Sequence, residues 1–358
     1  MLPHEQRRTR LIASFPDTID AILVTRIVNV RYLTGFTGSN GAVLIRRTGE
    51  PLMATDGRYL TQVAAEAPEL EILDARAVAP AMVERTRSLG VGRLGIEAGD
   101  VTLELNEVLT DVAGDALSLV ATDGMVERLR SIKDAGEVEA LARACEITDA
   151  GFGEILPRLR PGVSETDVAW WLHGSMREHG AEGLAFDTIV AFGPHSAIPH
   201  HRPSDRTLEA GDLVKLDFGA RYDGYHADMT RTVVISPAAE WQRDLHAVVR
   251  QIQQDCREAT VIGASPRDLD QLARDSIEGS GHQAAHGLGH GVGLEVHELP
   301  FLSVQSSADR LVDRVPVTVE PGVYLPGRGG VRIEDTVIVG ADGARSLTTS
   351  SRELIEIS

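Results

Sequence analysis

The sequence predicts two domains, an α/β layer domain at the N-terminus and a larger α+β domain behind it. Its 358 residues are enough for about two domains of ordinary size. Short β-rich runs alternate with helix-like runs up to residue 122. Beyond residue 123 long amphipathic helices appear, and the strands between and after them carry isolated carboxylates. We therefore place the domains at 1–122 and 123–358.

The first domain is predicted from the order of its elements. Helix-like composition separates most of its strand-like runs, and this alternation is typical of an α/β layer fold. The Gly/Ser/Asn-rich stretch 29–42 is expected to form turns. The expected strands are 20–25, 41–46, 51–56, 70–75, 93–98 and 117–122, and the expected helices are 58–67, 80–89 and 102–113.

The helices of the second domain are predicted from their start signals. Asp134 followed by Glu137 resembles a capping box at the start of a long amphipathic helix. Ser164 opens a second helix that extends to about residue 179. Ser236-Pro237 and Ser265-Pro266 have the form of N-cap and N1 pairs, and each predicts a further helix.

Composition limits the classes of protein. An apolar content of 42% and a charged content of 25% are those of a soluble globular protein. The net charge of −18 argues against binding to nucleic acid or to an anionic membrane surface. No run is apolar enough for a membrane span, and no secretory signal is evident, so a cytoplasmic location is expected. The two cysteines, Cys145 and Cys256, are expected to be buried apolar residues.

Two aspartates stand out in residues 211–235. Asp217 lies in an otherwise apolar strand, where a lone carboxylate would be strongly destabilised unless paired or bound to a metal. Asp228 begins a second β-rich run, and a hairpin would place both aspartates on neighbouring strands. A pair of hydrogen-bonded structural aspartates explains this pattern equally well.

Two further acids lie on strands near the C-terminus. Alternation places Glu320 opposite the valines of its strand, and it places Glu334 on one face with Arg332. Four carboxylates in one domain would repel each other severely if nothing neutralised them. Divalent cations such as Mn²⁺ suit oxygen ligands, and several carboxylates with one histidine are what a two-metal site needs.

The stretch HGLGHGVGLEVHE, residues 286–298, supplies three histidines. Its glycine content argues against a helix, so the spacing of His286 and His290 is not that of a helical zinc-protease motif. It also lacks the strand, helix and later acid of a dinucleotide-binding loop. Glycines that let the backbone approach a site closely are the better interpretation.

At these residues the chain resembles the M24-type metallopeptidases of the prolidase, aminopeptidase P and creatinase group. The segments NVRYLTGFTGSNGA and ATDGRY are similar to the N-terminal domain of that group. The segments LDFGARYDGYHADMTRT, HGLGHGVGLEVHE, VEPGVY and GVRIED are similar to its catalytic signatures. The resemblance covers essentially the whole chain and implies the "pita-bread" fold for the catalytic domain.

The resemblance implies a role for each candidate residue. It implies a two-metal site in which Asp217 binds one metal, His290 and Glu320 bind the other, and Asp228 and Glu334 bridge both. Arg332 would steady the bridging carboxylate. Three histidines would contact the substrate: His200 near the scissile bond, His297 at the carbonyl oxygen and His286 at the wall of the proline pocket. His195 and His201 have no expected role and are taken as surface neighbours.

The implied activity is hydrolysis of Xaa-Pro dipeptides by a metal-bridging hydroxide, with Glu320 as proton shuttle. The alternatives are a Xaa-Pro aminopeptidase acting on longer peptides and, more distantly, an inactive peptide-binding relative. Methionine aminopeptidase is disfavoured by the extra N-terminal domain, and creatinase is disfavoured because it needs no metal ligands. The expected cofactors are two divalent ions per chain, Mn²⁺ first and Co²⁺ or Zn²⁺ as alternatives. The resemblance also implies a homodimer.

Overall fold

The computed structural model describes residues 3–358 and divides the chain into two compact units, Met1–Arg130 and Ser131–Ser358. This division falls slightly beyond the domain boundary predicted at residue 123, because the helix α6 (Met125–Arg130) belongs to the first unit. None of the helices within residues 3–358 is both long and apolar enough to cross a membrane.

The first unit is built on one mixed sheet with the strand order β4-β3-β2-β1-β5-β6. Every strand predicted up to residue 122 is present, within a residue or so at each end. Antiparallel pairing joins β1 to β2 and β2 to β3, and parallel pairing joins the remaining neighbours. The strands are β1 (Ala21–Val24), β2 (Gly41–Arg46), β3 (Leu52–Thr55), β4 (Glu71–Asp74), β5 (Arg93–Glu97) and β6 (Ser118–Thr122).

The three predicted helices of this unit are present, and α1, α2 and α6 accompany them. The prediction of turns throughout 29–42 is wrong, because Ile27–Thr34 forms a helix that ends at Gly35 in the left-handed conformation, with φ of 82°. Its buried residues Val30 and Leu33 explain how packing outweighs the turn-like composition. The helices other than α6 are α1 (Pro3–Ala13), α2 (Ile27–Thr34), α3 (Leu60–Glu66), α4 (Val78–Ser88) and α5 (Leu103–Ala113).

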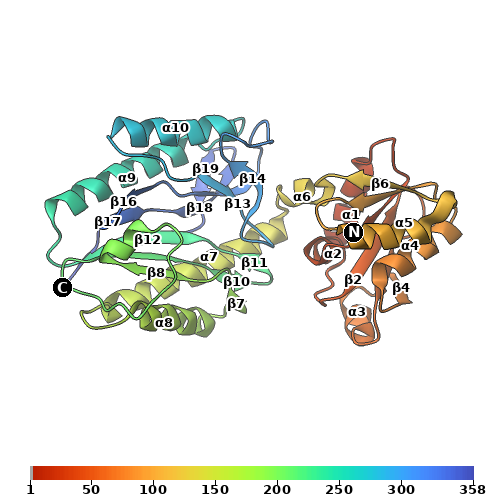
Figure 1. Ribbon diagram of the computed structural model, residues 1–358, viewed down its shortest axis with the longest axis horizontal. Coiled ribbons are helices and arrows are strands. Elements are labelled where there is room, and N and C mark those ends of the chain that lie inside the picture. The colour runs from red at the N-terminus through yellow and green to blue at the C-terminus, as the bar shows by residue number, and fades with distance from the viewer. Residues whose placement is uncertain (1–2) are drawn as a thin grey trace. The chain divides into compact units, whose positions relative to one another are not determined.

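The second unit has two halves, each a pair of helices packed on a sheet, with the sheets between the helix pairs (Figure 1). In one half, α7 (Ala135–Ile155) and α8 (Glu165–Glu178) pack on the sheet β20-β12-β9-β8. In the other half, α9 (Glu240–Ala259) and α10 (Pro266–Gly279) cover the sheet β14-β13-β15-β18-β19. This is the α+β architecture predicted for the second domain.

The strands of the first half include the predicted hairpin. In it β9 and β12 pair antiparallel, with Thr230 opposite Asp217. Two short strands, β10 and β11, extend its tip and pair with each other, and β10 also pairs with β7 in a separate small sheet. The strands are β7 (Gly183–Leu184), β8 (Ile189–Phe192), β9 (Leu213–Phe218), β10 (Ala220–Tyr222), β11 (Tyr225–His226), β12 (Met229–Ile235) and β20 (Glu356–Ile357).

The strands of the second half run from residue 289 to residue 346. The hairpin β16–β17 forms its own two-stranded sheet and packs against β9. The strands are β13 (Gly289–Gly291), β14 (Glu298–Leu302), β15 (Pro316–Val319), β16 (Gly322–Leu325), β17 (Gly329–Arg332), β18 (Asp335–Gly340) and β19 (Gly343–Ser346). Within residues 3–358, short 3₁₀ helices are formed by Gly114–Ala116, Leu156–Arg158 and Gly193–Ala197.

Three of the four predicted helix starts in this unit are confirmed. Asp134 forms a capping box with Glu137, Ser164 caps α8, and Ser265 caps α10. The start predicted at Ser236-Pro237 is wrong, since α9 begins at Glu240. The backbone N–H of Ser236 donates to the Ile357 carbonyl at 2.8 Å, so the chain is still paired with β20 at that residue.

Candidate metal centre

The candidate centre lies where the two halves of the second unit meet. Asp217 comes from the end of β9, and Asp228 directly precedes β12. The other half supplies His290 from β13, Glu320 directly after β15, and Glu334 directly before β18. Ligand atoms of Asp228, His290 and Glu334 all lie within 4.8 Å of one another. The predicted convergence of strand carboxylates is therefore present.

Two cavities of about 480 and 320 Å³ open beside these residues. Both are bordered by His200, His290, His297, Glu320 and Arg332. The larger one also reaches His286, and the smaller one reaches the three remaining acids. All nine residues singled out from the sequence thus line this pair of cavities.

The acids face one another; Asp217, Asp228 and Glu334 are buried, and Glu320 is partly exposed to the cavities. Burial, and next the charge of Asp217, raise the pKa of Asp228 well above its usual value. Burial and the charge of Asp228 do the same to the pKa of Glu334, and burial raises the pKa of Glu320 to about 7. Within the described chain, Asp217 Oδ1 and Glu334 Oε1 are buried without a hydrogen-bond partner. A cation is the missing partner that would let these groups ionise together.

The tautomer and the low pKa of His290 suit a neutral metal ligand. Its Nδ1 lies 3.0 Å from the Gly291 carbonyl oxygen, which only accepts, so Nδ1 carries the proton. Burial and the nearby His297 lower the pKa of His290 to about 3, so Nε2 keeps its lone pair at neutral pH. Nε2 lies 3.4 Å from Glu320 Oε1 and 3.6 Å from Asp228 Oδ2. An imidazole oriented through its other nitrogen, with its free nitrogen facing carboxylates, is typical of metal ligation.

Arg332 joins the two sides of the centre. Its guanidinium is buried and donates to Asp217 Oδ2, to Thr230 Oγ1 at 3.1 Å and to the Tyr324 hydroxyl at 2.8 Å. Thr230 in turn donates to Glu334 Oε2 at 2.6 Å. Arg332 therefore contacts Asp217 directly and reaches Glu334 through Thr230.

His286 lies at the end of a hydrogen-bond chain that starts at Arg332. Its Nδ1 donates to the Gly287 carbonyl at 2.8 Å, so its Nε2 accepts from the Tyr324 hydroxyl at 2.9 Å. Burial and Arg332 lower the pKa of His286 to about 4, in keeping with a neutral ring. Because both ring nitrogens are occupied, His286 offers the cavity only carbon atoms and its ring face.

Two glycines let the backbone pass close to the centre. A Cβ at Gly289 would lie 2.1 Å from the Thr318 carbonyl oxygen, and one at Gly291 would lie 2.2 Å from the Leu299 carbonyl oxygen. At these two positions, on either side of His290, β13 lies directly against the backbone of its neighbouring strands β15 and β14. The stretch forms no helix, as its glycine content predicted.

Sequence reasoning missed several residues around the centre. Lys215 shares a face of β9 with Asp217, and a cation in that apolar strand was a signal that could have been followed. Tyr324 and Thr230 carried no comparable signal. The view of His195 and His201 as surface neighbours is wrong, since both contact the buried carboxylate of Glu165.

Comparison with known proteins places the chain in a family. The profile of metallopeptidase family M24 matches residues 139–341, and that of the creatinase/prolidase N-terminal domain matches residues 7–132. The chain belongs to metallopeptidase family M24. The predicted family and the two-domain pita-bread architecture are thereby confirmed, and membership implies divalent metal ions.

Three similar proteins illustrate the relationship. The uncharacterized peptidase YqhT of Bacillus subtilis is 41% identical, over 94% of this chain and 96% of that protein. The solved Xaa-Pro dipeptidase from Bacillus anthracis is 38% identical with a TM-score of 0.94, covering 98% of this chain and 99% of the other. The X-Pro aminopeptidase from Thermotoga maritima MSB8 is 35% identical with a TM-score of 0.89, covering 98% and 100%.

The close approach at Gly289 generates a prediction. Gly289→Ala should lower the free energy of unfolding by about 1–3 kcal/mol and weaken metal binding, because the new methyl group pushes β13 away from β15. Urea unfolding and metal titration measure both effects. Gly153→Ala, on an exposed turn of α7 with nothing within 4 Å, is the matched control and should be neutral or slightly stabilising. Equal stability of Gly289→Ala and the wild type would contradict this account of the glycine.

Proposed function

We propose that the protein hydrolyses the Xaa-Pro bond of dipeptides, with two divalent metal ions held by Asp217, Asp228, His290, Glu320 and Glu334. The observation that carries the proposal is the set of buried acids around a neutral histidine at the wall of a cavity. Mn²⁺ is the proposed metal, because it accepts an oxygen-rich ligand set. The homodimer and the cytoplasmic location stay predictions, as does the domain boundary at residue 123.

The metal ions, when bound, would make a water molecule nucleophilic at neutral pH and polarise the scissile carbonyl. The protein residues do the rest. Glu320 would take the proton of the attacking water and deliver it to the departing proline nitrogen. His297 is exposed to the cavity beside His290, with 4.3 Å between ring centroids, and would donate to the developing oxyanion.

The substrate would lie in the larger cavity. Leu299 and Phe301 give this cavity an apolar wall, which suits a proline ring. The carbon face of His286 would extend the same wall, since its nitrogens are already hydrogen-bonded. His200 borders both cavities and would contact the substrate near the scissile bond.

The proposed role of Glu320 predicts the outcome of its substitution. Glu320→Gln should reduce kcat by at least about 100-fold, because an amide cannot carry the proton. The metal-free variant should unfold no more easily than the metal-free wild type, since one of several mutually repelling carboxylates is gone. Steady-state kinetics and urea unfolding measure these effects, with the exposed Glu278→Gln as the control. Full turnover by Glu320→Gln would remove its role.

Substrate length decides between the two peptidase activities. The proteins similar to this chain include one named dipeptidase and one named aminopeptidase, and the proposed catalytic residues suit both activities. We expect kcat/KM for a Xaa-Pro dipeptide to exceed that for the same peptide extended by one C-terminal residue. Parallel measurement on the two substrates tests this expectation. A preference for the longer peptide would favour the aminopeptidase.

A further inference from the structure

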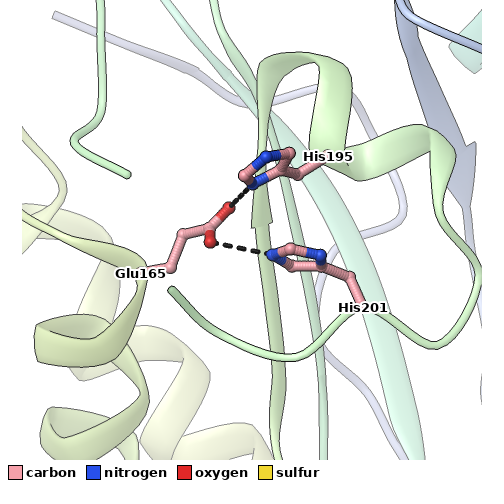
Figure 2. Close-up of side chains that lie close together, drawn as sticks. All are labelled: Glu165, His195 and His201. Atoms are coloured by element: carbon pink, nitrogen blue, oxygen red, sulfur yellow. Dashed lines mark hydrogen bonds and ion pairs between the residues drawn. The ribbon is translucent and has the colours of Figure 1, made fainter. Parts of the chain in front are cut away.

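A second polar cluster, outside the candidate centre, surrounds Glu165 at the start of α8. The carboxylate is fully buried, yet all of its partners come from the segment Phe192–Ser204 rather than from its own helix. Oε1 accepts from the Phe192 backbone N–H at 2.8 Å and from His195 Nδ1 at 2.9 Å. Oε2 accepts from His201 Nε2 at 2.8 Å. Figure 2 shows the two histidines converging on the one carboxylate.

Ser204 completes the cluster. Its backbone N–H and its hydroxyl donate to Glu165 Oε2 at 2.9 and 2.6 Å. A carboxylate with two histidines has the ligand types of a metal site. Here, however, five donors already meet a group with about four lone-pair positions. Burial alone would raise the pKa of Glu165, but the hydrogen bonds from Ser204 and His201 outweigh it and keep the pKa below its usual value. The cluster is therefore satisfied as an anionic anchor without a cation.

The anchored segment carries His200. The side chain of His200 is exposed to both cavities and makes no hydrogen bond to residues 3–358. Its position therefore depends on how the backbone on either side of it is held. His201, directly after it, is fixed through its ring to Glu165.

The backbone before His200 is held from the opposite side. Lys215 is fully buried, and its Nζ donates to the carbonyl oxygens of Ile198 at 2.6 Å and Pro199 at 3.1 Å. Arg332 adds a third hydrogen bond, from Nη1 to the Pro199 oxygen at 3.2 Å. A buried carboxylate on one side and the buried Lys215 and Arg332 side chains on the other thus fix the backbone that flanks His200.

We propose that Glu165 is a positioning residue that holds His200 at the cavity, with Lys215 as the second anchor of the same segment. The proposal rests on the proposed function, because it assigns His200 to substrate contact. Glu165 touches no part of the cavity and acts only through the segment Phe192–Ser204. Of the nine residues proposed for the site, His200 is the one that lies in this segment, so the replacement of Glu165 should act on catalysis through His200.

A double-mutant cycle tests this coupling. Glu165→Gln keeps the size of the side chain but brings an NH₂ group against N–H donors, and we expect kcat/KM to fall roughly 10- to 100-fold. His200→Ala should cause a similar loss, and the double variant should lose no more than His200→Ala alone. Glu178→Gln, at the exposed end of the same helix, is the matched control and should leave kcat/KM unchanged. Losses that multiply in the double variant would overturn the proposal.

Hydrogen exchange supplies a readout that does not depend on activity. In Glu165→Gln the amides of Phe192 and Ser204 should exchange at least about tenfold faster, while the amides of α10 stay unchanged. Unchanged exchange at Phe192 and Ser204 would overturn the anchoring. If Glu165→Gln fails to fold, Lys215→Met enters the same cycle with His200→Ala, with the same expected coupling. A wild type that leaves Xaa-Pro peptides intact would refute the proposed function, and the exchange rates would still decide the anchoring.

Discussion

The structure depends on an electrostatic conflict inside its second unit. Buried carboxylates from both halves of the fold converge on a histidine whose free nitrogen is a lone pair and not a proton donor. Burial raises the pKa of Asp228, Glu320 and Glu334 and so favours their neutral forms, and the ionised acids would repel one another. Cations between the acids would stabilise their ionised forms, and in this way the fold would create the proposed metal centre.

Arg332 connects the acids of the centre to the surrounding protein through hydrogen bonds. It pairs with Asp217, reaches Glu334 through Thr230, and orients His286 through Tyr324. One guanidinium therefore links a proposed ligand of each half to the wall of the larger cavity. The same group also holds the backbone before His200, so that the proposed metal ligands and the proposed substrate contacts share one support.

Most residues of the candidate centre could be singled out from the sequence because their types are unfavourable in the segments where they occur. Asp217 in an apolar strand is unfavourable without a partner, and the glycines around His290 are unsuitable for a helix. Residues whose type is ordinary for their segment could not be singled out from the sequence. Glu165 looks like an ordinary acid in the first turn of a helix, and only the tertiary fold brings the segment Phe192–Ser204 against it.

The errors have the same origin. The helix Ile27–Thr34 forms because its buried side chains outweigh a turn-like composition. The helix expected at Ser236-Pro237 starts later because Ser236 is still paired with β20, more than a hundred residues away in the chain. Short-range signals predict what a segment prefers, whereas distant partners decide which preference is expressed. His195 and His201 were misjudged for this reason too.

The number of divalent ions bound per chain tests the central claim most directly. Protein reconstituted with Mn²⁺, freed of excess metal and analysed by elemental mass spectrometry should carry two ions per chain, and Glu334→Gln should carry fewer. The bound metal should also raise the free energy of unfolding, because it binds the folded state and resolves the repulsion among the acids. A wild type that retains no metal, with unfolding insensitive to Mn²⁺, would contradict the account.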